Sequence, residues 1–322
     1  MMPRPILAVV GAGQFGRNHC RVIHESGLAE LRAVVDIDAA RAAEVAALYG
    51  ARALTDARDL DGQVEAAVVA VPTSAHEEVG CALLDRGIDV LVEKPITPGL
   101  DAAARLIETA GRRGRVLQVG HLERFNPAVM ELERRATLPL FFEIHRLNQF
   151  SARSLDVDVV LDLMIHDVDI VLSLAGAELA EIRGAGISIL SEKVDIANVR
   201  LQFANGCVAN LTASRVSTER VRKLRLFQPQ QYLSVDYGRQ DLAIFSVGEG
   251  RRIGFEQAQV VKTEPLRAQF EAFLGCIKNR QTPKCSGLAA RQTLGVALTI
   301  LDKIKEHSEA VSRTLSKAGW KP

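Results

Sequence analysis

An apolar stretch near the middle of the chain carries three carboxylates and an imidazole at helical spacing. Asp158, Asp162, His166 and Asp169 follow one another at intervals of four, four and three residues, so a helix over 158–174 would stack them on one face. The burial of such groups is costly unless they are paired or used. Histidine titrates near neutrality and can take the proton of an alcohol, while Asp162 can orient its ring. The pattern predicts general-base chemistry.

The same residues allow two other interpretations. Asp162 and His166 can form a buried structural pair, or they can be metal ligands four residues apart with Asp169 as a third. No cysteine or second histidine joins them at the spacing of a zinc site, and no metal is therefore expected.

A glycine pattern near the N-terminus predicts a dinucleotide site. Gly11, Gly13 and Gly16 form GxGxxG between an apolar run and a helical pattern, and Asp36 follows 20 residues beyond Gly16. The glycines allow a tight turn and a close approach of the pyrophosphate to the helix N-terminus. Asp36 is placed to accept hydrogen bonds from the adenosine ribose and to repel a 2′-phosphate, so NAD is expected in preference to NADP. Arg41 weakens this preference only slightly, and the alternative is a tight turn without a cofactor.

A third group of residues lies where two further predicted strands end. Val71, Pro72 and Thr73 end one strand, at the carboxyl edge where open α/β sheets bind ligands. Glu93, Lys94 and Pro95 end the next, and the proline can fix the backbone there as a cis peptide. Lys94 is expected to point toward the cofactor crevice and to stabilise a developing alkoxide. Its alternative is a surface lysine at a strand end.

The elements that must position these residues alternate between strand and helix up to about Gly120. The expected strands are Ile6–Val10, Leu31–Val35, Ala66–Val71, Val90–Val92 and Val116–Val119. The expected helices are Phe15–Ser26, Ala39–Tyr49, Ala75–Asp85 and Leu100–Ala110. This alternation predicts a doubly wound parallel sheet.

After about residue 137 strand patterns follow one another, which predicts an α+β region with a large, mostly antiparallel, open-faced sheet. The expected strands are Phe141–Leu147, Ile182–Leu190, Asn198–Phe203, Cys207–Ser214, Lys223–Phe227, Gln231–Asp236, Leu242–Ser246 and Glu256–Val261. The expected helices are 158–174, Pro265–Asn279 and Leu288–His307. The fold class is therefore α/β with two domains, 1–121 and 122–322.

Composition excludes several classes of protein. The net charge of +1 over 322 residues leaves no electrostatic footprint for nucleic acid or an anionic membrane. The five cysteines are scattered without a CxxC pair, which fits a reducing cytoplasm and predicts no disulfide framework. The apolar run Ile6–Val10 is too short for a signal peptide, and no run is long enough to span a membrane.

The motifs together resemble the glucose–fructose oxidoreductase/inositol dehydrogenase/MocA family. The matching residues are GAGQFG at 11–16, PTSAH at 72–76, EKP at 93–95 and Asp162-x-x-x-His166. The resemblance implies that residues 1–121 are an NAD-binding Rossmann domain and that 122–322 carry the substrate site and the oligomer contacts. It implies hydride transfer between a sugar or polyol carbon and a nicotinamide. The implied catalytic residues are Lys94, Asp162 and His166. The implied cofactor-binding residues are Gly11, Gly13, Gln14, Phe15, Gly16, Asp36, Val71, Pro72, Thr73, His76, Glu93, Lys94 and Pro95.

Two further stretches narrow the resemblance to the branch that acts on nucleotide-activated amino sugars. They are GHLERFNPA at 120–128 and DLMIHDVDIVLSL at 162–174. The branch implies NAD-dependent oxidation of the 3-hydroxyl of UDP-N-acetylglucosamine to a ketone, for transamination in lipid A precursor synthesis. Guanidinium groups suit the phosphates of such a substrate. The expected substrate-binding residues are His121, Arg124, Asn126, Arg153 and His166.

Several alternatives remain open. Arg124 and Arg153 can instead form surface or interdomain ion pairs. The substrate can be a free polyol such as inositol, which offers no phosphate to these arginines. A non-catalytic NAD-binding sensor on the same fold is a third reading, although a sensor has no need of a base. The open sheet face predicts a homodimer or homotetramer.

Overall fold

The computed structural model describes residues 4–60, 62, 64–150, 157–317 and 319. They form two compact units. The first comprises Met1–Phe125 and Thr263–Leu294, and the second comprises Asn126–Lys262 and Gly295–Pro322. The predicted domains differ from this division, because residues 263–294 lie with the first unit and the chain passes between the units three times.

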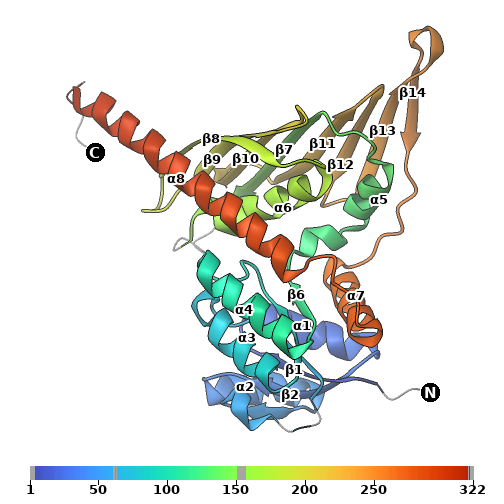
Figure 1. Cartoon of the computed structure of the whole chain (residues 1–322), viewed down its shortest axis with the longest axis vertical. Coiled ribbons are helices and arrows are strands. Elements are labelled where there is room, and N and C mark those ends of the chain that lie inside the picture. The colour runs from blue at the N-terminus through green and yellow to red at the C-terminus, as the bar shows by residue number, and fades with distance from the viewer. Residues whose placement is uncertain (1–3, 61, 63, 151–156, 318, 320–322) are drawn as a thin grey trace. The chain divides into compact units, whose positions relative to one another are not determined.

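The first unit is built on a six-stranded parallel sheet with the strand order β3-β2-β1-β4-β5-β6 (Figure 1). This is the doubly wound order that places a crevice at the carboxyl ends of β1 and β4. The strands β1 and β4 are apolar throughout, and every residue except Ile6 is buried, as in strands covered on both faces. The strands are β1 (Ile6–Val10), β2 (Glu30–Val35), β3 (Arg52–Leu54), β4 (Ala66–Val69), β5 (Asp89–Val92) and β6 (Leu117–Val119).

Helices cover both faces of this sheet. The α-helices are α1 (Gln14–Ser26), α2 (Ala39–Tyr49), α3 (His76–Asp85), α4 (Leu100–Arg113) and α7 (Pro265–Asn279), and short 3₁₀ turns lie at Ala57–Asp59, Thr73–Ala75 and Leu122–Phe125. Although α7 is remote in sequence, Phe270, Phe273 and Ile277 pack into the same core as β1 and α1. Burial of each such side chain stabilises the unit by about 1.5–3 kcal/mol. The first unit is therefore complete only with α7.

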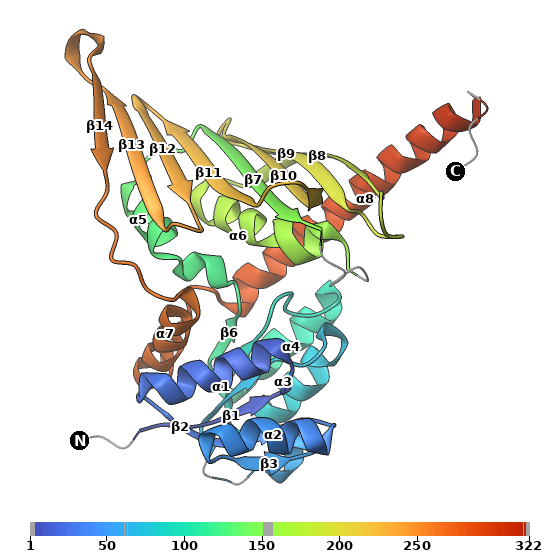
Figure 2. The ribbon, with the colours of Figure 1, turned by 180° about the vertical axis from the view of Figure 1, so that it is seen from behind.

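The second unit contains an eight-stranded sheet in the order β14-β13-β12-β11-β7-β10-β9-β8, and Figure 2 shows β14 at one edge. All neighbouring pairs are antiparallel except β7 and β10. The strands are β7 (Phe141–Gln149), β8 (Leu179–Ile187), β9 (Ile196–Phe203), β10 (Val208–Ser217), β11 (Val221–Gln228), β12 (Gln231–Asp236), β13 (Asp241–Val247) and β14 (Ile253–Gln257). A 3₁₀ turn at Glu249–Arg251 precedes β14.

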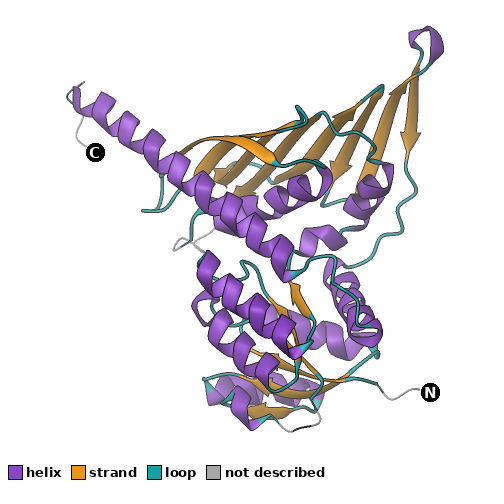
Figure 3. Ribbon diagram, in the orientation of Figure 1, coloured by secondary structure: helices purple, strands orange, loops and turns teal. Residues whose placement is uncertain are grey.

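One face of this sheet is packed and the other is open. Alternate residues of β7, β10 and β11 are buried, as a sheet with one covered face requires. The core contains residues of α5 (Pro127–Arg135), of α6 (Ile165–Leu174) and of the middle of α8 (Gly287–Lys317). Figure 3 shows α5 and α6 on the same face, and no described helix of this unit covers the other. The mostly antiparallel, open-faced sheet is confirmed.

Several predicted elements differ from the structure, and β8 and β14 each begin three residues before the predicted strands. The edge strand β3 and the helix α5 were not expected, and the helix predicted over 158–174 begins instead with a π-helical turn at Val160–Met164. The last helix continues ten residues beyond its predicted end at His307. Among the described residues no helix is long and apolar enough to cross a membrane.

Candidate functional site

A cavity of about 790 Å³ opens at the carboxyl ends of β1, β2 and β4 in the first unit. It is lined by seven of the predicted cofactor-binding residues, namely Gly11, Gly13, Gln14, Phe15, Asp36, Val71 and Pro72. Further lining comes from Ile37, Arg41 and Arg58. The cavity therefore lies at the predicted crevice, and seven of the predicted cofactor-binding residues line it.

The glycine turn has the geometry that a dinucleotide needs. Gly11 has a φ of +98°, and a Cβ there would lie 2.4 Å from the carbonyl oxygen of Ala70. A Cβ at Gly16 would lie 1.7 Å from the carbonyl oxygen of Gly11, so α1 and β1 could not pack as closely with any other residue. A Cβ at Gly13, by contrast, would meet no heavy atom within 4 Å, although Gly13 lines the cavity. The turn leaves a pyrophosphate room beside the N-terminus of α1.

Asp36 is held as an anion at the end of β2. Its Oδ2 accepts a hydrogen bond from the backbone N–H of Ala12 at 2.7 Å. Its Oδ1 accepts from the N–H of Asp38 and from Nη2 of Arg41, each at 2.9 Å. Burial opposes ionisation, but these hydrogen bonds and the charge of Arg41 outweigh it, so the pKa of Asp36 lies below its usual value. Asp36 is thus ionised, and Arg41 is bound to it directly.

Lys94 lies at the end of β5, in a turn fixed by its neighbours. The Lys94–Pro95 peptide bond is cis, one of the conformations that the sequence allowed, and Lys94 is half-buried. The carboxylate of Glu93 lies 2.7 Å from Nε2 of His19 on α1, and its second oxygen accepts from the backbone N–H of Lys94 at 3.3 Å. Glu93 stays a predicted cofactor-binding residue, and its carboxylate contacts the buried His19.

His76, which is also predicted to bind the cofactor, is buried beside this turn. It is 1% exposed, and its ring nitrogens lie 3.0 Å from the carbonyl oxygens of Pro95 and Val71. Burial lowers the pKa of this imidazole. His76 therefore links the ends of β4 and β5 and supports the turn that carries Lys94, while Thr73 begins the short 3₁₀ turn beside it.

The predicted substrate residues of the first unit are buried. His121 follows β6 with 1% of its surface exposed, and Arg124 lies in the 3₁₀ turn after it with 7% exposed. A surface ion pair is therefore excluded for Arg124. Arg153 lies outside the described residues.

In the second unit, Asp162 and His166 lie on either side of a change in helix geometry. Asp162 is in the π turn, whose end is marked by a hydrogen bond from the N–H of Ile165 to the carbonyl of Val160, and His166 is in the first turn of α6. Both side chains are half-buried. A π turn inserts one residue into a helix and rotates the later residues about the helix axis, so the stacking expected for a continuous α-helix does not apply. Such turns occur frequently at functional sites.

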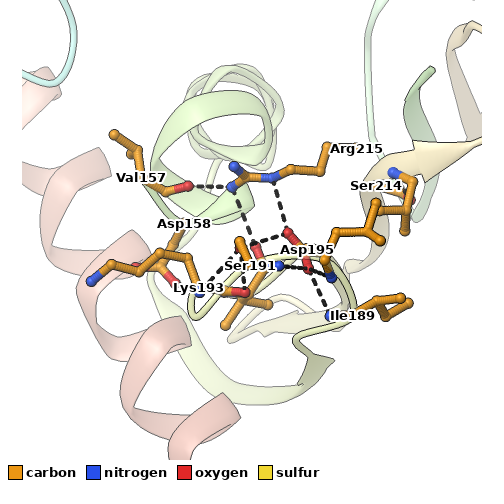
Figure 4. A network of polar contacts seen from close by, with 11 residues as sticks. Val157, Asp158, Ile189, Ser191, Lys193, Asp195, Ser214 and Arg215 are labelled. Atoms are coloured by element: carbon orange, nitrogen blue, oxygen red, sulfur yellow. Dashed lines mark hydrogen bonds and ion pairs between the residues drawn. The ribbon is translucent and has the colours of Figure 1, made fainter. Parts of the chain in front are cut away.

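A polar network fixes the start of this helical segment (Figure 4). Asp158, the first carboxylate of the predicted stripe, accepts a hydrogen bond from the N–H of Val194 at 2.9 Å. Asp195, which is fully buried, accepts from the N–H groups of Ile189 and Leu190 at 2.6 Å each. Arg215 reaches Asp195 at 3.6 Å and donates to the carbonyl of Val157. Asp158 thus anchors the helix to the β8–β9 loop.

Asp167 was not anticipated, although it neighbours His166. Its two oxygens accept from Nη2 and Nε of Arg146 on β7, at 2.7 and 2.8 Å, and its Oδ1 lies 3.2 Å from the hydroxyl of Tyr237. Both charged side chains are 2% exposed. The signal in the sequence was Arg146 itself, since it occupies the apolar side of an alternating strand. The pair fixes α6 to the sheet.

Asn126, predicted to bind the substrate, also has a structural role. Its Oδ1 accepts from the N–H of Ala128 and so caps α5, and its Nδ2 donates to the carbonyl of Tyr237, both at 3.1 Å. Both the oxygen and the nitrogen of the Asn126 side-chain amide therefore form hydrogen bonds within the second unit.

Comparison with known proteins agrees with this fold and cavity. Residues 7–121 match the model of an oxidoreductase family with an NAD-binding Rossmann fold, and residues 105–230 match the GFO/IDH/MocA C-terminal domain. The chain is 38% identical to UDP-N-acetylglucosamine 3-dehydrogenase of Acidithiobacillus ferrooxidans over 298 residues, which cover 91% of this chain and 95% of that one. It is 30% identical to an inositol 2-dehydrogenase of Pseudarthrobacter chlorophenolicus over 188 residues, 55% of this chain and 56% of that one.

Solved structures show the same similarity. Two structures of UDP-N-acetylglucosamine 3-dehydrogenase from Acidithiobacillus ferrooxidans match with TM-scores of 0.89 and 0.90, at 36% identity, and cover 95% of this chain and 99% of those. The fold and the dinucleotide cavity define an NAD-binding oxidoreductase. The chain belongs to the GFO/IDH/MocA family of oxidoreductases, as its motifs had indicated.

Proposed function

We propose that the protein oxidises the 3-hydroxyl of UDP-N-acetylglucosamine to a ketone with NAD. The observation that carries this proposal is the 38% identity to UDP-N-acetylglucosamine 3-dehydrogenase over 91% of the chain. It is supported by the presence of Lys94, Asp162 and His166, the three residues that the family resemblance implies as catalytic.

Each catalytic residue has a distinct role in this proposal. The bound dinucleotide supplies the acceptor for the hydride that leaves the sugar carbon. The hydroxyl proton must leave as well, and either Lys94 or His166 accepts it while the other side chain holds the oxygen by a hydrogen bond. Asp162 orients the imidazole and stabilises its charged form. The structure supports Lys94 and His166 for this chemistry because both are partly buried at the ends of fixed elements.

The proposed substrate also needs cations for its diphosphate. Arg124, which is buried in the first unit, is the first candidate, and Arg153 is the second candidate by sequence. His121 would hydrogen-bond the sugar or the pyrophosphate, and Asn126 would act beside it while it caps α5.

The test of the function is NADH formation with a panel of substrates. We expect turnover with UDP-N-acetylglucosamine, and none with free N-acetylglucosamine or inositol, which lack the diphosphate. Turnover of inositol without turnover of any UDP-sugar would replace the proposed substrate by a polyol. Tight NAD binding with no turnover of any member would favour a sensor over an enzyme.

We propose NAD in preference to NADP, because the carboxylate of Asp36 occupies the end of β2 as an anion. Asp36→Ala should raise the KM for NAD more than that for NADP, since it removes both the ribose acceptor and the repulsion of a 2′-phosphate. The measurement is the ratio of the two KM values, with Glu44→Ala on the exposed face of α2 as the control. An unchanged ratio would remove Asp36 from the proposal.

We propose that a second copy of the chain covers the open sheet face. Phe141, Phe227, Tyr232, Phe245 and Phe255 lie directly opposite one another on five adjacent strands, with ring centroids 4.9–5.7 Å apart. Phe255 is 62% exposed. An apolar row of this length is typical of an interface, and a flat face can pair with itself about a two-fold axis. A monomeric mass by light scattering would refute the proposal.

We propose that the ketone passes to an aminotransferase in the cytoplasm, as a step of lipid A precursor synthesis. A 3-keto sugar is the class of compound that transamination consumes, which makes oxidation the forward direction. The five cysteines are free thiols, which suits a reducing compartment.

A further inference from the structure

We propose that His19 is a positioning residue for the reaction, which holds Lys94 in place through the carboxylate of Glu93. This inference rests on the role of Lys94 in the proposed function, and it adds a residue to which no role has been given. It arises from a buried contact between the dinucleotide helix α1 and the end of β5.

The contact is short and enclosed. His19 is 1% exposed, and its Nε2 lies 2.7 Å from Oε1 of Glu93, whose side chain is 13% exposed. The other ring nitrogen, Nδ1, has no hydrogen-bond partner among the described residues. An ionised carboxylate only accepts, so Nε2 must carry the proton of this hydrogen bond. The buried imidazole of His19 therefore bonds to Glu93 in a single orientation.

Glu93 connects its contact with His19 to the turn that carries Lys94. Burial raises the pKa of its carboxyl, but the hydrogen bond and charge of His19 and the charge of Lys94 outweigh burial, and the pKa lies below its ordinary value. Its Oε2 accepts from the backbone N–H of Lys94 at 3.3 Å. An anion is thus fixed beside Lys94, bound on one side to α1 and on the other to the peptide of Lys94 itself.

The surroundings leave Glu93 little freedom to move. A Cβ at Gly120 would lie 2.8 Å from its Oε2 and 3.1 Å from its Cδ, so the carboxylate fills the space that the glycine leaves. His76 holds the following residues from the other side, through the carbonyl oxygens of Pro95 and Ile96. Two buried histidines therefore fix the turn, and His19 does so from the helix at which the pyrophosphate binds. A shift of about 1 Å in a reacting group can cost on the order of a hundredfold in rate.

The experiment compares His19→Leu, His19→Gln and the exposed His24→Leu on the same helix. We expect His19→Leu to lower kcat by about 10- to 100-fold, with the Kd for NAD by calorimetry and the KM for the sugar close to wild type. Glutamine keeps an N–H donor at the same distance, so His19→Gln should recover most of the lost rate. Because α1 also forms the dinucleotide turn, His24→Leu controls for general effects on that helix. Gly120→Ala, which displaces Glu93 without touching His19, should lower kcat as well.

A second measurement does not depend on turnover. The reactivity of the Lys94 amine toward trace acetic anhydride, followed by mass spectrometry, should change in His19→Leu and not at the exposed Lys278 on α7. If the wild type turns over no substrate, the proposed function fails, and this labelling still tests the positioning role. The inference is overturned if His19→Leu leaves both kcat and labelling unchanged. It is equally overturned if kcat, NAD affinity and thermal stability fall together and glutamine restores none of them.

Discussion

Replacement of His166 by alanine should lower kcat roughly 100-fold or more, with the Kd for NAD near wild type. Histidine is the residue type whose ordinary pKa suits proton transfer from an alcohol near neutral pH. The dinucleotide cavity lies wholly in the first unit, so removal of this ring leaves its lining intact. Steady-state kinetics and calorimetric titration with NAD separate the two effects.

A second histidine of the same unit provides the control. His145 is half-buried on the open side of β7, and His145→Ala should keep kcat within about twofold of wild type, as a surface substitution away from the reacting groups should. Added imidazole should restore part of the rate of His166→Ala. Equal losses in the two variants, or a loss in NAD affinity that matches the loss in kcat, would exclude His166 as a base.

The second large effect is expected on stability. Arg146→Met should lower the free energy of unfolding of the second unit by about 3–5 kcal/mol, because it leaves the carboxylate of Asp167 buried without its charge partner. The hydroxyl of Tyr237 cannot replace a guanidinium that binds both oxygens. Urea denaturation followed by far-UV circular dichroism measures the change.

Two comparisons decide whether the buried charge is the cause. Arg146→Met combined with Asp167→Leu should recover most of the stability, since no unpaired carboxylate then remains. Arg225 and Glu143 form a 2.8 Å pair on the open face of the same sheet, each 36% exposed. Arg225→Met should therefore cost no more than about 1 kcal/mol. A double variant as unstable as the single one would point to lost packing instead.

The sequence predicted the first sheet well because its signals are local. The apolar runs are buried on both faces, and each is followed by a helical pattern. Both features indicate the same arrangement, a parallel sheet whose strands are connected by helices. The dinucleotide turn was equally accessible, since Gly11, Gly13, Gly16 and Asp36 sit at fixed distances from one strand. The strand β3 was not predicted because its three residues lie at an edge of the sheet and are largely exposed.

The supporting contacts of the site could not be predicted in the same way. Glu93 and His19 are 74 residues apart, and Asp167 and Arg146 are 21 apart, with no periodicity to join them. The π turn was missed because the spacing of Asp162 and His166 is also that of one α-helical turn. The sequence signalled a buried ion pair in one way, by a polar residue on the apolar side of an element, such as Arg146.

The division of the chain also bears on the order in which the protein can fold during synthesis. The core around β1 includes Phe270, Phe273 and Ile277 of α7, which are translated only after the whole eight-stranded sheet. Domains usually form as their residues leave the ribosome, N-terminal first. Here the nucleotide-binding half must wait, with part of its core exposed, until nearly three hundred residues have been made. The other half is finished later still, because Val296, Ala297, Ile300 and Ile304 of α8 complete its core. Neither half is therefore complete before the C-terminal helices have been made.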